Sequence, residues 1–247
     1  MKQYNIEALI EEPLFKGIVL IGTIHLDLEA RSTLFMLLER LAPACIAVEI
    51  SRFSVDFRQK KQKHWNIKLN TLLKTIPPKD RGHYRIELLK RQINMPFEWT
   101  ISKRAAWSLG IPSVPLDSSK ISRKELPLWD KELLTADNLL FLINEPNKDI
   151  KEYFNFHYEK AKALFLNNCD MKCLFEQLVL DKNWCKREKT LSKRLLMLLE
   201  QYKTVVYIGG WIHTIEQEKF ITLAKLVKPR VKARYLITGK EITLFHN

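Results

Sequence analysis

Two apolar segments near opposite ends of the chain share one pattern of hydrophobic and polar positions. Ile18–His25 reads IVLIGTIH and Val205–His213 reads VVYIGGWIH. In each segment an apolar run breaks at a glycine, and a histidine follows three residues later. Continuous apolar runs of this length are typical of strands buried on both faces of a parallel sheet. The pattern therefore predicts two buried strands, each leading into a Gly-x-x-His loop.

The first of these strands is followed by helical periodicity over residues 28–41. Leu34, Leu38 and Leu41 fall on one face of this segment, and Pro43 ends it. Residues 45–50, CIAVEI, then form a second apolar run. Strand, helix and strand over so few residues predict a βαβ unit with a right-handed crossover.

The rest of the chain alternates helical patterns with short strand patterns. Residues 52–95 and most of 127–200 indicate helices, and Pro115 places the short strand at 112–117 on an edge of the sheet or in an irregular position. The other expected elements are helices at 99–109 and about 189–202, a strand at 204–208, a helix through Phe220, Ala224 and Val227, and strands at 231–237 and 241–245. We therefore expect one α/β domain over residues 1–247, with a central, mostly parallel sheet flanked by helices and a mainly helical insertion around 120–200.

Charge and cysteine content narrow the setting of the protein. Lys and Arg number 41 against 28 Asp and Glu, so the formal net charge is +13. The first thirteen residues lack the apolar core of a secretory signal, and no apolar run approaches the length of a membrane span. Four cysteines are few for this length, which favours a reducing compartment. These features predict a cytoplasmic protein without a transmembrane segment, and they leave open whether it forms a homo-oligomer.

Four residues that could carry chemistry stand at or just after the ends of predicted strands. They are His25, Glu49, Asp117 and His213. Because ligands bind at the carboxyl ends of strands in open parallel sheets, we expect these side chains to converge. Two histidines and two carboxylates suit a divalent cation or a general acid–base pair. Each residue also has a plainer interpretation, as a surface or capping residue in a loop.

Other positions support such a site. Gly22 and Gly210 allow a sharp turn or a close approach of a ligand, which predicts a substrate-binding role. Glu98 would favour the positive end of the helix that it begins, and Arg187 is one more charge in a basic helix. The metalloprotease motif HExxH, a Walker loop, the dinucleotide motif GxGxxG and a GxSxG elbow are all missing from the sequence.

The ordered set of motifs resembles a known superfamily. IGTIH with His25, AVEIS with Glu49 and GGWIH with His213 are similar to the paired GxxH motifs and the glutamate of the TraB/PrgY, GumN and TIKI superfamily, which is related to the erythromycin esterases and ChaN-like proteins. The resemblance spans nearly the whole chain. The first motif continues as Leu-Asp, where TraB proteins usually have Val-Ser.

This resemblance implies a metal-dependent hydrolase of the metalloprotease type, acting on a peptide or small-molecule substrate. It implies that His25, Glu49 and His213 form the catalytic core and hold Mn, Co or Zn. Arg187 takes the place of the family's arginine, and Glu98 and Asp117 match acidic positions that would contact substrate. The arginine that relatives have soon after the glutamate corresponds to Arg52 or Arg58.

Two other functions stay open. A non-catalytic protein of the pheromone-shutdown type would keep the pocket to bind a peptide or a small ligand. A nucleic acid is the less favoured partner, because the basic stretch with interleaved aromatic residues at His64–Arg91 would bind a single strand by stacking and charge.

Overall fold

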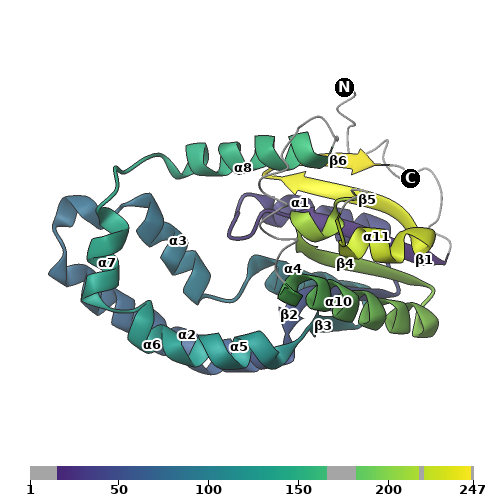
Figure 1. Ribbon diagram of the computed structural model, residues 1–247, viewed down its shortest axis with the longest axis horizontal. Coiled ribbons are helices and arrows are strands. Elements are labelled where there is room, and N and C mark those ends of the chain that lie inside the picture. The colour runs from purple at the N-terminus through teal and green to yellow at the C-terminus, as the bar shows by residue number, and fades with distance from the viewer. Residues whose placement is uncertain (1–15, 166–181, 217–219, 246–247) are drawn as a thin grey trace. The chain divides into compact units, whose positions relative to one another are not determined.

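The computed structural model describes residues 16–165, 182–216 and 220–245, which form an α/β fold around a six-stranded sheet (Figure 1). The sheet has the order β3-β2-β4-β1-β5-β6. Its strands are β1 (Gly17–Thr23), β2 (Cys45–Ser51), β3 (Ser113–Asp117), β4 (Thr204–Gly210), β5 (Val231–Thr238) and β6 (Glu241–Phe245). The prediction of a mostly parallel α/β sheet is confirmed, and β3 lies on the edge that Pro115 indicated.

The strand order brings the two Gly-x-x-His segments side by side. β4 lies between β2 and β1 and is parallel to both, and β1 is also parallel to β5. In this register Gly22 is opposite Gly209 and Thr23 is opposite Gly210. Two strands separated by almost the whole chain therefore end at the same level of the sheet.

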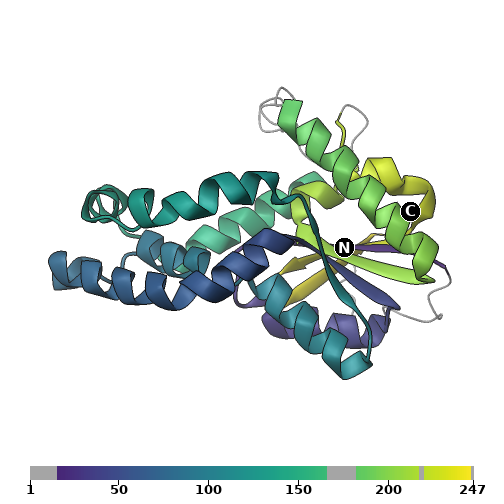
Figure 2. The ribbon, with the colours of Figure 1, turned by 90° about the horizontal axis from the view of Figure 1, so that it is seen from below.

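Helices cover both faces of this sheet, as Figure 2 shows. α1 (Ala30–Leu41) and α4 (Phe97–Leu109) lie on one side, and α10 (Lys182–Gln201) and α11 (Leu223–Val227) lie on the other. The second side contains a core in which alternate strand residues, such as Ile18 and Leu20, contact Leu191, Leu195 and Leu199 of α10. The apolar runs of the sequence are continuous because both faces of each central strand are buried.

The chain divides into two compact units. The sheet unit comprises the described residues of Met1–Glu49, Phe97–Asp117 and His157–Asn247, and the helical unit comprises Ile50–Pro96 and Ser118–Phe156. The helical unit contains α2 (Arg52–Leu72), α3 (Tyr84–Ile93), α5 (Ser119–Glu125), α6 (Trp129–Glu132) and α7 (Ala136–Ile143), and α8 (Ile150–Phe165) is divided between the units. Trp65, Leu69, Ile86 and Leu139 are central in its apolar core.

Two helices differ most from their expected bounds. α10 begins at Lys182, earlier than the periodicity near 189 indicated, so Arg187 and Glu188 are helical. α11 is shorter than expected and excludes Phe220, because Thr222 caps its start by accepting a hydrogen bond from Lys225 N. Among the described residues, no helix is both long and apolar enough to cross a membrane.

Candidate functional site

The candidate site lies at the carboxyl ends of the parallel strands in the sheet unit. His25 follows β1 by two residues, Glu49 is near the end of β2, and His213 lies in the 3-10 turn Trp211–Thr214 directly after β4. Asp117 is the last residue of β3. The structure therefore brings the four residues to the edge where the sequence predicted them.

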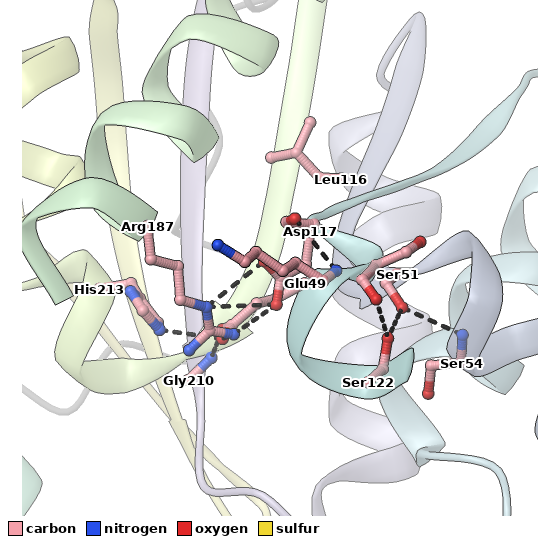
Figure 3. A network of polar contacts seen from close by, with 12 residues as sticks. Glu49, Ser51, Ser54, Leu116, Asp117, Ser122, Arg187, Gly210 and His213 are labelled. Atoms are coloured by element: carbon pink, nitrogen blue, oxygen red, sulfur yellow. Dashed lines mark hydrogen bonds and ion pairs between the residues drawn. The ribbon is translucent and has the colours of Figure 1, made fainter. Parts of the chain in front are cut away.

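Glu49 is the centre of this network. Its Oε2 accepts hydrogen bonds from Gly210 N at 2.7 Å and from Tyr207 Oη at 3.1 Å. Its Oε1 lies 2.5 Å from Arg187 Nη2 and 2.9 Å from His213 Nε2 (Figure 3). Burial would raise the pKa of this carboxyl, but the His213 and Arg187 charges and their hydrogen bonds outweigh burial and hold the pKa far below its ordinary value. Glu49 is therefore a fixed anion, with both oxygens engaged.

Arg187 reaches from α10 to two carboxylates. Its Nη2 lies 2.6 Å from Asp117 Oδ2, and its Nε donates to the same carboxylate, while Nη2 also contacts Glu49 (Figure 3). Burial alone would lower the pKa of Arg187, but the Glu49 and Asp117 charges raise it. Its Nη1 makes no hydrogen bond to any residue that the structure describes, and the side chain is 28% exposed. Within the described part of the chain, one edge of the guanidinium is thus open to a ligand.

His213 is buried between two carboxylates. Its Nδ1 lies 2.5 Å from Glu188 Oε1, and its Nε2 faces Glu49. The ring also stacks on Trp184, with centroids 4.7 Å apart. Burial lowers the pKa of His213, but the charges and hydrogen bonds of Glu49 and Glu188 overcome burial and raise the pKa to about 9. His213 is therefore a buried imidazolium at neutral pH.

His25 is held differently. Its Nδ1 lies 2.8 Å from Glu98 Oε1, and Glu98 in turn accepts a hydrogen bond from Thr23 Oγ1 at 3.0 Å. The His25 side chain is 55% exposed, whereas that of Glu98 is 5% exposed. Partial burial lowers the pKa of His25, but the hydrogen bond and charge of Glu98, with the charge of Glu49, leave it raised above 6.5. Its Nε2 has no hydrogen-bond partner among the described residues.

Two glycines allow these groups to approach one another. A Cβ on Gly210 would lie 2.8 Å from His25 Nε2 and 3.6 Å from Glu49 Oε2, so the free nitrogen of His25 and the buried carboxylate flank one point of the backbone. A Cβ on Gly209 would meet Tyr207 Oη and Glu49 Oε2. Side chains at these positions would displace the network.

The two Gly-x-x-His segments are similar in their side-chain partners as well as in sequence. Each histidine has its Nδ1 on a buried glutamate from a helix, Glu98 of α4 for His25 and Glu188 of α10 for His213. These glutamates fix the orientation of the rings. The two halves differ at Nε2, which is bound to Glu49 in His213 and has no partner among the described residues in His25.

A divalent cation does not fit this arrangement of donors. A carboxylate at each histidine Nδ1 is common around metal-binding histidines. However, Glu49 Oε1 and His213 Nε2, two atoms that a cation would need as ligands, already bind each other. Glu49 Oε1 also contacts the Arg187 guanidinium, whose positive charge would repel a cation. Among the described residues, no three His, Cys, Asp or Glu side chains are grouped so as to hold one metal ion. We therefore derive no step through a metal, and the metal ligands His25, Glu49 and His213 stay a prediction.

The other predicted residues have varied positions. Glu98 lies in the network as the partner of His25, and Asp117 lies there as the partner of Arg187. The backbone at Gly22 lies close to Thr214 and Trp211 in the turn after β4. A substrate-binding role for Gly22 stays a prediction. Arg52 and Arg58 are in the helical unit. Arg52 pairs with Asp56, and Arg58 donates to the carbonyl oxygens of Gln92 and Asn94.

Sequence reasoning missed four members of the network. They are Glu188, Tyr207, Thr23 and Trp184. Glu188 has 0% of its side chain exposed, and its Oε2 also accepts a hydrogen bond from Leu223 N. Glu188 could have been found as an acidic residue next to Arg187 on a helix whose opposite face is basic. This inference requires the correct start of α10 at Lys182.

Comparison of the chain with protein-family models, with curated proteins and with solved structures finds no match.

Proposed function

We propose that the protein is a hydrolase of the TraB/TIKI type, in which His25 acts as a general base toward a carbonyl-type bond of a peptide or a small molecule. The observation that carries this proposal is the His25–Glu98 pair. A half-exposed imidazole is fixed at Nδ1 by a buried carboxylate and is open at Nε2. This is the arrangement that a base needs in order to accept a proton from water. The resemblance of the paired GxxH motifs and Glu49 to the TraB/TIKI superfamily also supports the proposal.

In this mechanism neutral His25 takes a proton from water at Nε2 while the water oxygen adds to the substrate carbonyl carbon. Glu98 accepts the hydrogen bond from Nδ1–H and stabilises the imidazolium that forms. The open edge of Arg187 would stabilise the oxyanion or hold an anionic group of the substrate. His25 then returns its proton to the leaving group as the tetrahedral intermediate collapses.

The remaining charged groups keep this geometry in place. Glu49 and the His213 imidazolium form a buried ion pair directly behind Gly210, next to the open nitrogen of His25. Buried ion pairs of this kind are costly to break. We therefore assign Glu49 and His213 to positioning and charge, and not to proton transfer.

The test is a hydrolysis assay over a panel of esters, lactones, amides and peptides, with wild-type protein, His25→Gln and the control His64→Gln. His64 is an exposed histidine of the helical unit and pairs with Asp130. We expect turnover that is lost in His25→Gln and kept in His64→Gln. Equal turnover in all three proteins would refute the role of His25.

A parallel assay addresses the metal. The same panel is repeated after chelation and then with added Mn²⁺, Co²⁺ or Zn²⁺. The metal-free route predicts no loss on chelation. Loss on chelation with recovery on adding one cation would replace this route by the metal-dependent one that the family resemblance implies.

The full engagement of Glu49 also favours a second candidate, a non-catalytic binding protein. A carboxylate with both oxygens bonded within the fold holds its neighbours in place without taking part in a reaction. This candidate predicts no hydrolysis over the panel, together with thermal stabilisation by a peptide or a small ligand that is weakened in Arg187→Lys.

A further inference from the structure

The helical unit concentrates positive charge on α2. Residues Ile50–Pro96 contain twelve Lys and Arg against three Asp and Glu, a large share of the whole chain's +13. Over α2 and the 3-10 turn that follows it (Leu73–Thr75), seven basic residues accompany one acidic residue, Asp56. This excess is unusual, because positive and negative side chains are interspersed on a typical protein surface.

Three of these seven basic residues, Lys60, Lys63 and Lys74, lie on one exposed face of the helix and of the turn that follows it. Spacings of three and four residues place six exposed side chains on this face: Lys60, Lys63, His64, Ile67, Thr71 and Lys74. We call this the lysine face of α2. At 1.5 Å per residue it extends for about 20 Å, which is roughly six base pairs of a nucleic-acid duplex.

Two carboxylates near this face are already engaged. Asp56 pairs with Arg52, and Asp130 contacts both His64 and Lys68. Lys60, Lys63 and Lys74 have no ion-pair partner in the part of the chain that the structure describes. Their charges are therefore available to an external anion.

The aromatic residues of this region do not serve as a stacking surface. Trp65 and Tyr84 are buried, and Trp65 contacts Phe57 and Trp129 in the core of the helical unit. The expectation that the stretch His64–Arg91 stacks on single-stranded bases is therefore wrong for these rings. What remains on the surface is charge, which contacts phosphates without reading bases.

We infer that the lysine face of α2 binds the phosphate backbone of a nucleic-acid duplex without sequence preference. Charge complementarity supports this occupant, because Lys60, Lys63 and Lys74 have no ion-pair partner among the described residues and are spread over a length that spans several phosphates of a duplex. An anionic membrane is less favoured, since Ile67 is the one large apolar side chain exposed on α2 in the described structure. This function is independent of the hydrolase site.

The test measures binding of a labelled 20-base-pair DNA duplex by fluorescence anisotropy between 50 and 200 mM salt. Three phosphate contacts predict a contribution of about −3 to the slope of log affinity against log salt, or roughly a 40-fold loss over this range. The triple variant Lys60→Gln, Lys63→Gln and Lys74→Gln should lose that contribution. Circular dichroism checks that it remains folded.

A matched control removes the same charge elsewhere. Lys186, Lys189 and Lys193 are exposed on α10 in the sheet unit, and the triple replacement by Gln should leave the slope unchanged. Equal losses in both triple variants would show that only net charge matters and would overturn the inference. Failure to bind duplex at 50 mM salt, or binding only to vesicles with anionic lipid, would overturn it as well.

Discussion

Protonation of His213 should make the stability of the sheet unit depend on pH in the neutral to alkaline range. Its pKa is raised from 6.5 to about 9 because Glu49 and Glu188 hold the imidazolium between them. A group whose pKa is higher in the folded state stabilises the fold fully below its unfolded pKa, and this contribution is lost as the pH rises through the folded pKa. The window for this loss therefore runs from about pH 6.5 to about pH 9.

The magnitude follows from the size of the shift. One pKa unit corresponds to about 1.4 kcal/mol, so the rise gives His213 about 3 kcal/mol of stabilisation, as an order of magnitude. Solvent does not screen this contribution, because the side chain is only 5% exposed. A difference of this size is a large part of the stability of an ordinary domain.

The assay is urea unfolding of wild type, His213→Gln and the control His64→Gln at pH 6, 7.5, 9 and 10. Wild type should exceed His213→Gln by about 3 kcal/mol at pH 6, and the gap should narrow as the pH rises above about 6.5 and be nearly gone at pH 9. His64 forms an exposed pair with Asp130, so His64→Gln should change stability by less than about 1 kcal/mol. A gap between wild type and His213→Gln that is the same at every pH would refute the imidazolium.

Three further predictions follow from the network. Gly210→Ala should keep the fold but lower turnover at least tenfold, because its Cβ displaces the half-exposed His25 ring. Gly209→Ala should instead lower the free energy of unfolding by about 2 kcal/mol, because its Cβ crowds buried groups. Paired measurements of activity and urea unfolding check both variants. Glu98→Gln removes a charge that raises the pKa of His25, so the acid limb of the pH–rate profile should move to lower pH, and an unmoved limb would count against the pair. Arg187→Met leaves two carboxylates without their cation and should cost about 3 kcal/mol in urea unfolding, with Lys193→Met as the exposed control on the same helix.

Much of the fold could be predicted because its determinants are local. The continuous apolar runs of β1 and β4, the helical spacing of α1 and the proline in β3 each act over a few residues. Buried parallel strands need apolar residues on both faces, and the missing N–H of proline restricts it to an edge. The placement of His25, Glu49 and His213 at strand ends followed from the same patterns.

Pairing within the site could not be predicted in this way. The sequence grouped His25, Glu49 and His213 in one catalytic core, whereas the structure pairs His25 with Glu98 and pairs Glu49 with His213. The cause is the strand order, which inserts β4 between β2 and β1. Glu49 of β2 is therefore next to the loop after β4, which contains His213.

The sequence by itself determined that two buried strands lead into Gly-x-x-His loops. It also determined that Glu49 stands near the end of the apolar strand that follows the first of these loops. Tertiary structure alone decided that Glu188 is the second partner of His213, that Glu49 has both oxygens engaged and that Nε2 of His25 is open. Local patterns set the periodicity and the turns of the backbone. Which charged groups meet depends on contacts between residues far apart in sequence, and these contacts form only when the sheet assembles.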